Sequence, residues 1–307
     1  MIDESIIKWL LEGDPSIQYQ VHRDLLDQDS KKLQGRISKE GWGAEFLSLQ
    51  NKNGHWGIAF YQPKWTSTHY TILELKNLCI SPNTKPIQKI IKSVLQNEMS
   101  HNYVKKYEMI VNKDICINGM VLNYAAYFKS DEADLKSIVD YILNNQMNDG
   151  GFNCQSTRKG AAHSSLHTTL SILEGIFEFK KNNYKHRIKE LKKGEQESIE
   201  FILKHRLYKS DKTGKVINDS FTRLSYPSRW KYDILRCLDY FQYANIDYDP
   251  RMQDALDLLI KKRNKDGLWA LQSKHPGQTH FEMERGGKPS RWNTLRALRV
   301  LKHFGFD

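Results

Sequence analysis

Basic residues gather in two stretches of the sequence where their side chains could bind an anion. Arg229 and Arg236 stand one heptad apart, and a helix that begins at Arg229 would place both on one face with Tyr232 and Asp233. Guanidinium groups present a rigid fork of donors that matches phosphate or carboxylate. These stretches therefore indicate a site for a diphosphate or another acidic headgroup. Their basic residues are Arg223, Arg229, Lys231, Arg236, Arg285, Lys288 and Arg291.

Carboxylates lie close to these cations in the sequence, which leaves a second interpretation open. Asp233, Asp239, Glu282 and Glu284 could form ion pairs with the arginines and hold neighbouring helices together. The basic residues would then stabilise the fold without binding a ligand.

Aromatic residues are the third group whose type could do chemistry. Aromatic faces attract cations, so aromatic side chains around an apolar pocket could stabilise a carbocation. Ordinary packing in the core is the alternative, and it is favoured for Trp56 and Trp269. The candidates are Trp56, Tyr61, Trp65, Tyr70, Tyr124, Tyr127, Phe152, Trp230, Tyr232, Trp269 and Trp292.

A repeated pattern predicts the elements that position these residues. Residues 46–57, 142–152 and 259–269 each contain an apolar helix end, Asn or Asp followed by glycine, and an aromatic residue. Glycine after Asn or Asp ends a helix because it adopts the left-handed conformation without a Cβ penalty. A second apolar helix is expected after each turn, over 66–78, 163–177 and 290–304. Further pairs are expected at 6–11 with 17–26, 87–99 with 116–128, and 195–205 with 229–241.

Six helix pairs and no sustained strand alternation predict an all-α fold. The spacing between pairs is about 48 to 58 residues, which suits two-helix repeats. Such pairs could stack as an open solenoid or close into a ring. Second helices that are apolar all round, and first helices that are amphipathic, favour an inner and an outer layer. The inner helices should begin near Thr66, Cys116, His163, Arg229 and Ser290, with their preceding loops at one end of the ring.

The Gln-containing turns and Thr-rich second helices resemble the repeats of the terpenoid cyclase and protein prenyltransferase superfamily. The similar segments are 50–56, 146–155 and 266–272, and the resemblance extends over nearly the whole chain. It implies one domain over residues 1–307, an (α/α)6 toroid of six inner and six outer helices. It also implies a prenyltransferase-like or terpene-cyclase-like protein that binds an isoprenoid or other amphipathic anion in a central cavity. The chain lacks the Asp-x-Asp-Asp motif of the cyclases.

The same resemblance implies a zinc site at Asp114, Cys116 and His167. Asp-x-Cys is followed by a His-Thr helix start, and His167 comes 51 residues after Cys116. Cys154 and His163 are alternative ligands, since His163 and His167 would share a helix face. Lys113, with Lys105 and Lys106, partly matches the diphosphate-binding residues of the prenyltransferases. A helix cap and ordinary core packing are the other interpretation of the Asp, Cys and His residues.

The substrate-binding residues expected are Trp65, Lys113, Arg223, Arg229, Tyr232, Arg236, Arg291 and Trp292. A net charge of +11 from 47 basic and 36 acidic residues suits an anionic ligand or contact with an anionic membrane surface. Nucleic acid is disfavoured because the sequence carries no helix-turn-helix, zinc-finger or RNP signature. Four scattered cysteines and no expected leader or membrane span favour the cytoplasm. A non-catalytic lipid-binding toroid and a carbohydrate-active toroid remain alternatives.

Overall fold

The computed structural model describes residues 2–98 and 114–306. Over this range the chain is all-α, as predicted: helices are joined by loops, with isolated β-bridges and no strand. No helix in these two ranges has the length and apolar character that crossing a membrane requires. The chain forms two compact units. Unit 1 holds residues 1–50, 77–81 and 203–307, and unit 2 holds residues 51–76 and 82–202.

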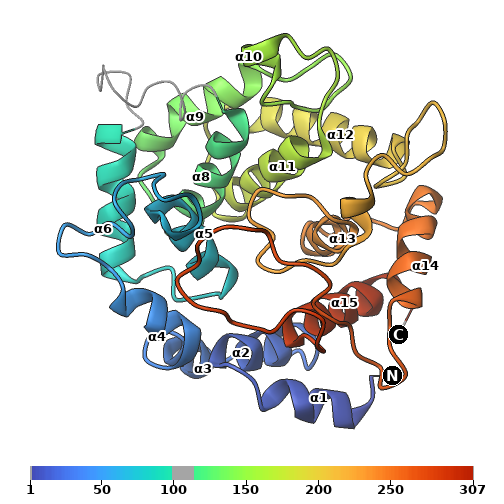
Figure 1. Cartoon of the computed structure of the whole chain (residues 1–307). Coiled ribbons are helices and arrows are strands. Elements are labelled where there is room, and N and C mark those ends of the chain that lie inside the picture. The colour runs from blue at the N-terminus through green and yellow to red at the C-terminus, as the bar shows by residue number, and fades with distance from the viewer. Residues whose placement is uncertain (1, 99–113, 307) are drawn as a thin grey trace. The chain divides into compact units, whose positions relative to one another are not determined.

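The elements follow the chain in the order that Figure 1 colours from blue to red. Unit 1 begins with α1 (Glu4–Leu11), α2 (Pro15–Asp24), α3 (Lys31–Arg36) and α4 (Gly41–Ser48). The elements that come mainly from unit 2 are η1 (Lys64–Thr66), α5 (Thr68–Asn77), α6 (Lys85–Ser93), η2 (Val94–Glu98), α8 (Ile115–Tyr127), α9 (Glu132–Asn144), α10 (Ser156–Lys159), α11 (Leu166–Lys181) and α12 (Ile188–Lys204). Unit 1 continues with η3 (Asp219–Thr222), α13 (Ile234–Tyr243), η4 (Pro250–Met252), α14 (Gln253–Lys261) and α15 (Arg291–Phe304).

The three glycine turns predicted from the repeat are present. Gly54, Gly150 and Gly267 have φ angles of 88°, 91° and 80°, a region that only glycine occupies readily. The same backbone bonds close each turn: the glycine N–H donates to the carbonyl three residues before it, over 2.8, 2.9 and 3.0 Å. The prediction that these glycines end the first helices is wrong, because α4, α9 and α14 already end at Ser48, Asn144 and Lys261. Each glycine closes a separate turn that follows the helix end.

A threonine of the second helix binds the aromatic residue that follows each turn. In all three copies the aromatic backbone N–H donates to the threonine Oγ1 over 3.0 Å. The aromatic side chains are almost completely buried, which confirms their packing in the core. The pairs are Thr68 with Trp56, Thr169 with Phe152, and Thr294 with Trp269.

First and second helices differ in burial as predicted. The first helix α9 buries one stripe, Leu135, Ile138, Val139 and Ile142, whereas the second helix α8 is buried on every side from Ile117 to Ala126. Within unit 2, α8 packs on α11 and on α9. Within unit 1, α15 packs on both α13 and α2. Second helices thus pack on second helices within each unit.

Two predicted helix starts are wrong. Helix α13 begins at Ile234 rather than Arg229, because Asp233 caps it by accepting the Arg236 N–H over 2.8 Å. Arg229 itself has a φ of 57°, which no right-handed helix contains. Helix α11 begins at Leu166, after an extended Ser165, so His163 lies in the preceding loop.

Two glycines allow α8 and α11 to approach each other closely. A Cβ on Gly119 would lie 2.7 Å from the Ser171 carbonyl oxygen, and one on Gly175 would lie 2.5 Å from the Gly119 carbonyl oxygen. Both distances are shorter than van der Waals contact. Helices α8 and α11, which run side by side in Figure 1, are therefore in contact through their backbones.

A buried charge network joins α2, α13 and α15 in unit 1. Arg299 is 5% exposed and binds both carboxylate oxygens of Asp239 over 2.6 Å each. Its third nitrogen donates to Asp24 over 2.8 Å and to the Tyr243 hydroxyl over 2.8 Å. Arg23 and Arg296 add further contacts to Asp24 and Asp239. Burial of these carboxylates therefore depends on the arginines.

Replacement of Gly119 by Ala should lower the free energy of unfolding by about 1–3 kcal/mol, because the new methyl group overpacks the contact between α8 and α11. Urea unfolding measures the change. Gly35→Ala in α3 is the matched control, since no atom lies within 4 Å of the added Cβ. That control should be neutral or stabilising by up to about 1 kcal/mol. Equal effects of the two substitutions would contradict the close approach of the helices.

Replacement of Arg299 by Met should cost about 3–5 kcal/mol of stability, because it leaves Asp239 and Asp24 buried with too few cations. Lys92→Met is the control. It breaks an exposed 3.5 Å pair with Asp131 and should cost less than about 1 kcal/mol. Chemical denaturation of the two variants beside the wild type gives both values. A stable Arg299→Met protein would show that the network does not hold the three helices.

Candidate functional site

Hydrogen bonds join two loops of unit 1, the loop that precedes α13 and the loop that precedes α15. The Gln272 N–H donates to the Leu224 carbonyl, and the Leu224 N–H donates to the Gln272 side chain, both over 3.0 Å. Ser225 and Ser273 share a hydrogen bond of 2.7 Å between their hydroxyls. The segment from 270 to 289 is thereby held against the segment from 224 to 229.

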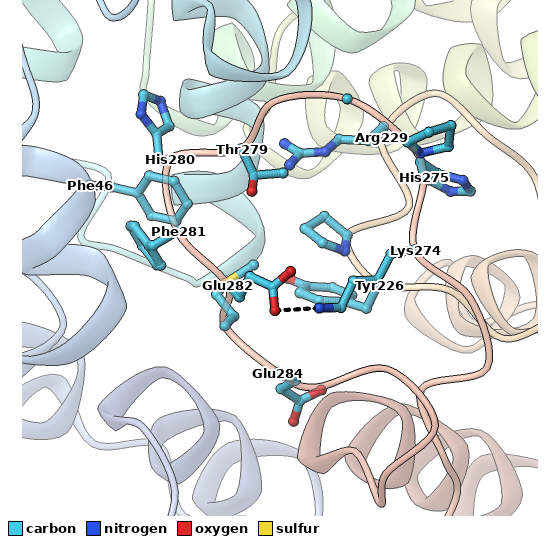
Figure 2. A pocket seen from close by; sticks show the side chains of 14 residues that line it. Phe46, Tyr226, Arg229, Lys274, His275, Thr279, His280, Phe281, Glu282 and Glu284 are labelled. Atoms are coloured by element: carbon cyan, nitrogen blue, oxygen red, sulfur yellow. Dashed lines mark ion pairs between the residues drawn. The ribbon is translucent and has the colours of Figure 1, made fainter.

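A pocket of about 200 Å³ lies between these loops (Figure 2). Most of its wall comes from the loop that precedes α15, and the rest comes from α4 and from the loop before α13. Basic, acidic and aromatic side chains all face it. Its lining residues are Phe46, Tyr226, Pro227, Arg229, Lys274, His275, Pro276, Gly277, Thr279, His280, Phe281, Glu282, Met283 and Glu284.

His275 is the lining residue with the most unusual electrostatic environment. Its Nε2 is buried and has no hydrogen-bond partner among the described residues. Burial, followed by the charges of Lys231, Arg229 and Arg236, lowers the pKa of His275 to about 4. The imidazole is therefore neutral at pH 7 and lies in a field set by three cations.

Aromatic groups form the apolar part of the wall. Phe46 packs on Phe281 with ring centroids 4.5 Å apart, and on the edge of His280 at 5.7 Å. Tyr226 stacks on Trp292 at 4.6 Å. Figure 2 shows Phe46, Phe281 and His280 on one side of the pocket and Tyr226 on another, with the Arg229 guanidinium group near Thr279. The pocket thus offers aromatic faces beside positive charge.

Both carboxylates of the pocket have structural partners. Glu282 forms a 2.7 Å ion pair with Lys274, the dashed contact in Figure 2. Glu284 accepts the hydroxyl of Ser290 and, over 2.7 Å, the backbone N–H of Arg291 at the start of α15. Burial outweighs these bonds and raises the pKa of Glu284. A half-buried carboxyl group therefore accepts a backbone N–H at the start of α15, at the edge of the pocket.

The predicted substrate residues fall in several places. Arg229 lines the pocket, and Arg236, whose guanidinium donates to the Lys231 carbonyl over 2.9 Å, acts on His275 through its charge. The shared face expected for Arg229 and Arg236 is wrong, since Arg229 precedes α13. Arg223 is exposed and is not among the lining residues.

The remaining substrate candidates lie outside the lining. The Tyr232 hydroxyl donates to the Leu207 carbonyl over 2.5 Å. Arg291 donates to the Trp9 carbonyl over 2.9 Å, with its guanidinium group 4.6 Å from the Trp9 ring centre. Trp292 supports Tyr226 from behind the pocket. Trp65 belongs to unit 2, where it packs on Tyr70, and Lys113 lies outside the described residues.

The structure shows which partners the carboxylates near the basic residues have. Asp239 pairs with Arg296 and Arg299, which the sequence did not single out. Glu282 pairs with Lys274. The carboxylates named from sequence therefore do have structural roles, but mainly with other cations than those predicted.

The candidate zinc ligands come together only in part. Among residues 2–98 and 114–306, no group of three or more His, Cys, Asp or Glu side chains is placed to hold a metal ion. Cys116 and the alternative ligand Cys154 are neighbours, and Asp114 acts on both through its charge. His167 lies in the first turn of α11, and the exposed His163 does not share its helix face.

The Cys116 and Cys154 thiols influence each other strongly. Their hydrogen bond, together with burial, raises the pKa of Cys116. The same hydrogen bond lowers the pKa of Cys154, whose sulfur also accepts the Thr168 hydroxyl. Cys154 is therefore the thiol of the pair that loses its proton more readily.

Sequence analysis missed most of the pocket. Lys274, His275, His280 and Phe281 lie in a loop without periodicity, so no spacing singled them out. The one available signal was the density of basic and aromatic residues in a long loop that leads to a second helix.

Comparison of the chain with family models, with curated proteins and with solved structures finds no match. The superfamily resemblance and the zinc site stay predictions.

The lowered pKa of His275 predicts a stability loss in acid. The unfolded chain binds a proton near pH 6.5 and the folded chain only near pH 4, so stability is complete above pH 6.5 and falls as the pH drops towards 4. Because the side chain is partly exposed, its share is at most about 1–2 kcal/mol. Urea unfolding at pH 7.5 and 4.5 should show a smaller loss for His275→Gln than for the wild type. His163→Gln, at an exposed loop position, should behave as the wild type.

Proposed function

We propose that the protein binds a small amphipathic anion in the pocket of unit 1. The acidic headgroup would contact Arg229, Lys274 and His275, and the apolar part would pack on Phe46, Phe281 and Tyr226. The observation that carries this proposal is the environment of the His275 imidazole, which has a buried Nε2 and three cations acting on it. An anion there would accept a hydrogen bond from the protonated imidazole and would be attracted by the surrounding charge.

The size of the pocket limits the ligand. Pockets for drug-sized molecules enclose about 300–1,000 Å³, and this one encloses about 200 Å³. A headgroup with a short apolar chain or a single ring suits that volume. For an isoprenoid diphosphate, the headgroup and the first isoprene unit would be the recognised part.

The finer predictions from sequence belong to the same proposal. The closed (α/α)6 toroid, the prenyltransferase-like or terpene-cyclase-like activity, the zinc ion and the cytoplasmic location are its untested parts. Packing of second helices on second helices within each unit supports the toroid. Glu284, a half-buried carboxyl with a raised pKa in the pocket lining, supports a catalytic form of the proposal.

Calorimetric titration tests the proposal with inorganic diphosphate, with isoprenoid diphosphates of increasing length, and with a short alkyl sulfonate. Affinity should rise on addition of the first isoprene unit and then level off. Arg229→Gln should weaken binding at least about tenfold, since a charged hydrogen bond contributes about 1.5–3 kcal/mol. Arg223→Gln should leave it unchanged, because Arg223 is exposed outside the pocket. Absence of binding at millimolar ligand, or equal losses in both variants, would contradict the proposal.

The pH dependence gives a second, independent test. A bound anion favours protonated His275, so its pKa rises in the complex and affinity should increase as the pH falls from 8 to 5. The sulfonate keeps its charge over this range, so the change reports on the protein alone. We expect about a tenfold gain for the wild type and a nearly flat profile for His275→Gln. An identical gain in that variant would place the titrating group elsewhere.

A further inference from the structure

Two cysteines from distant parts of the sequence lie against each other in unit 2. Cys116 is in the first turn of α8, and Cys154 is in the loop between the second glycine turn and α11. The Cys116 backbone N–H donates to the Cys154 sulfur over 3.3 Å, and the two thiols hydrogen-bond to each other. The remaining pair of cysteines has other surroundings: Cys237 is fully buried, and Cys79 accepts from Arg23 over 3.4 Å.

The surroundings hold the Cys154 sulfur in place. The Thr168 hydroxyl donates to it over 3.5 Å, and the Cys154 N–H lies 3.4 Å from the same hydroxyl oxygen. Both cysteine residues are half-buried. The sulfur that accepts an N–H from the first turn of a helix is the more nucleophilic of the two.

We propose that Cys116 and Cys154 form a reversible disulfide when the protein meets a hydroperoxide. The pair would be a redox-sensitive site that ties the start of α8 to the loop leading into α11. A disulfide has an S–S distance of about 2.05 Å, so forming the bond requires the two side chains to move closer than their present contact.

The chemistry needs one oxidant and no metal. The Cys154 sulfur attacks the peroxide, the O–O bond breaks, and the products are a sulfenic acid and an alcohol or water. The Cys116 sulfur then attacks the Cys154 sulfur and water leaves, so two thiols give two electrons to one peroxide. A dithiol reverses the reaction by exchange through a mixed disulfide.

Hydrogen peroxide treatment of the full chain tests the proposal, with thiol counting and peptide mapping under non-reducing conditions. The chain has four cysteines, and free thiols should fall from four to two. The mapped bond should join the peptides that contain Cys116 and Cys154, and dithiothreitol should restore all four thiols. The variant with Cys79→Ser and Cys237→Ser should form the same bond at the wild-type rate.

Single substitutions locate the bond further. Cys116→Ser should leave a Cys154 sulfenic acid that a dimedone probe traps, whereas Cys154→Ser should react with peroxide at least about tenfold more slowly. Three results on the wild type would overturn the proposal: oxidation of Cys79 before this pair, a disulfide between different chains only, or protection of both thiols by a bound metal ion that elemental analysis detects.

Discussion

A threonine hydroxyl, bound to the backbone of a buried aromatic residue, fixes each glycine turn against the second helix of its pair. The hydrogen bond joins the aromatic residue to the second helix whatever the length of the loop between the aromatic residue and the threonine. The two residues are 12 apart in the first copy, 17 in the second and 25 in the third. The fold is therefore preserved while loop length varies, and the longest of the three loops is the one that builds the pocket.

The repeat was predictable because its signals are local. Glycine after a polar residue adopts positive φ readily, so Gly54, Gly150 and Gly267 could be predicted as turns, although the helices before them end several residues earlier. The first residue of a helix was harder to predict, because apolar periodicity does not show which residue caps the helix. Asp233 caps α13, so the helix begins after Arg229. Arg229 therefore lies in the loop before α13, where it lines the pocket. The role of the threonines depends on a partner in another segment, which a single sequence does not reveal.

The sequence predicted a basic and aromatic site, but it identified only some of the residues that line the pocket. Arg229 was identified for its charge, and it does line the pocket, although from a loop with positive φ rather than from a helix face. His275 is the central residue of the proposed site because three cations lower its pKa together with burial. The position of its loop depends on the hydrogen bonds of Gln272 to Leu224. Spacing also suggested a metal group, but the start of α11 at Leu166 separated His163 from the helix face of His167.

The Arg299 network has a consequence for the order in which the chain is made. Asp24 pairs with the neighbouring Arg23 but is synthesised 275 residues before its second arginine, Arg299, and Asp239 is synthesised 60 residues before Arg299. Until α15 is made, the buried positions of Asp24 and Asp239 lack the Arg299 guanidinium group that bridges them. The helices of unit 2 all emerge within that interval. All residues of unit 2 are therefore in the nascent chain before unit 1 receives its final helix, α15.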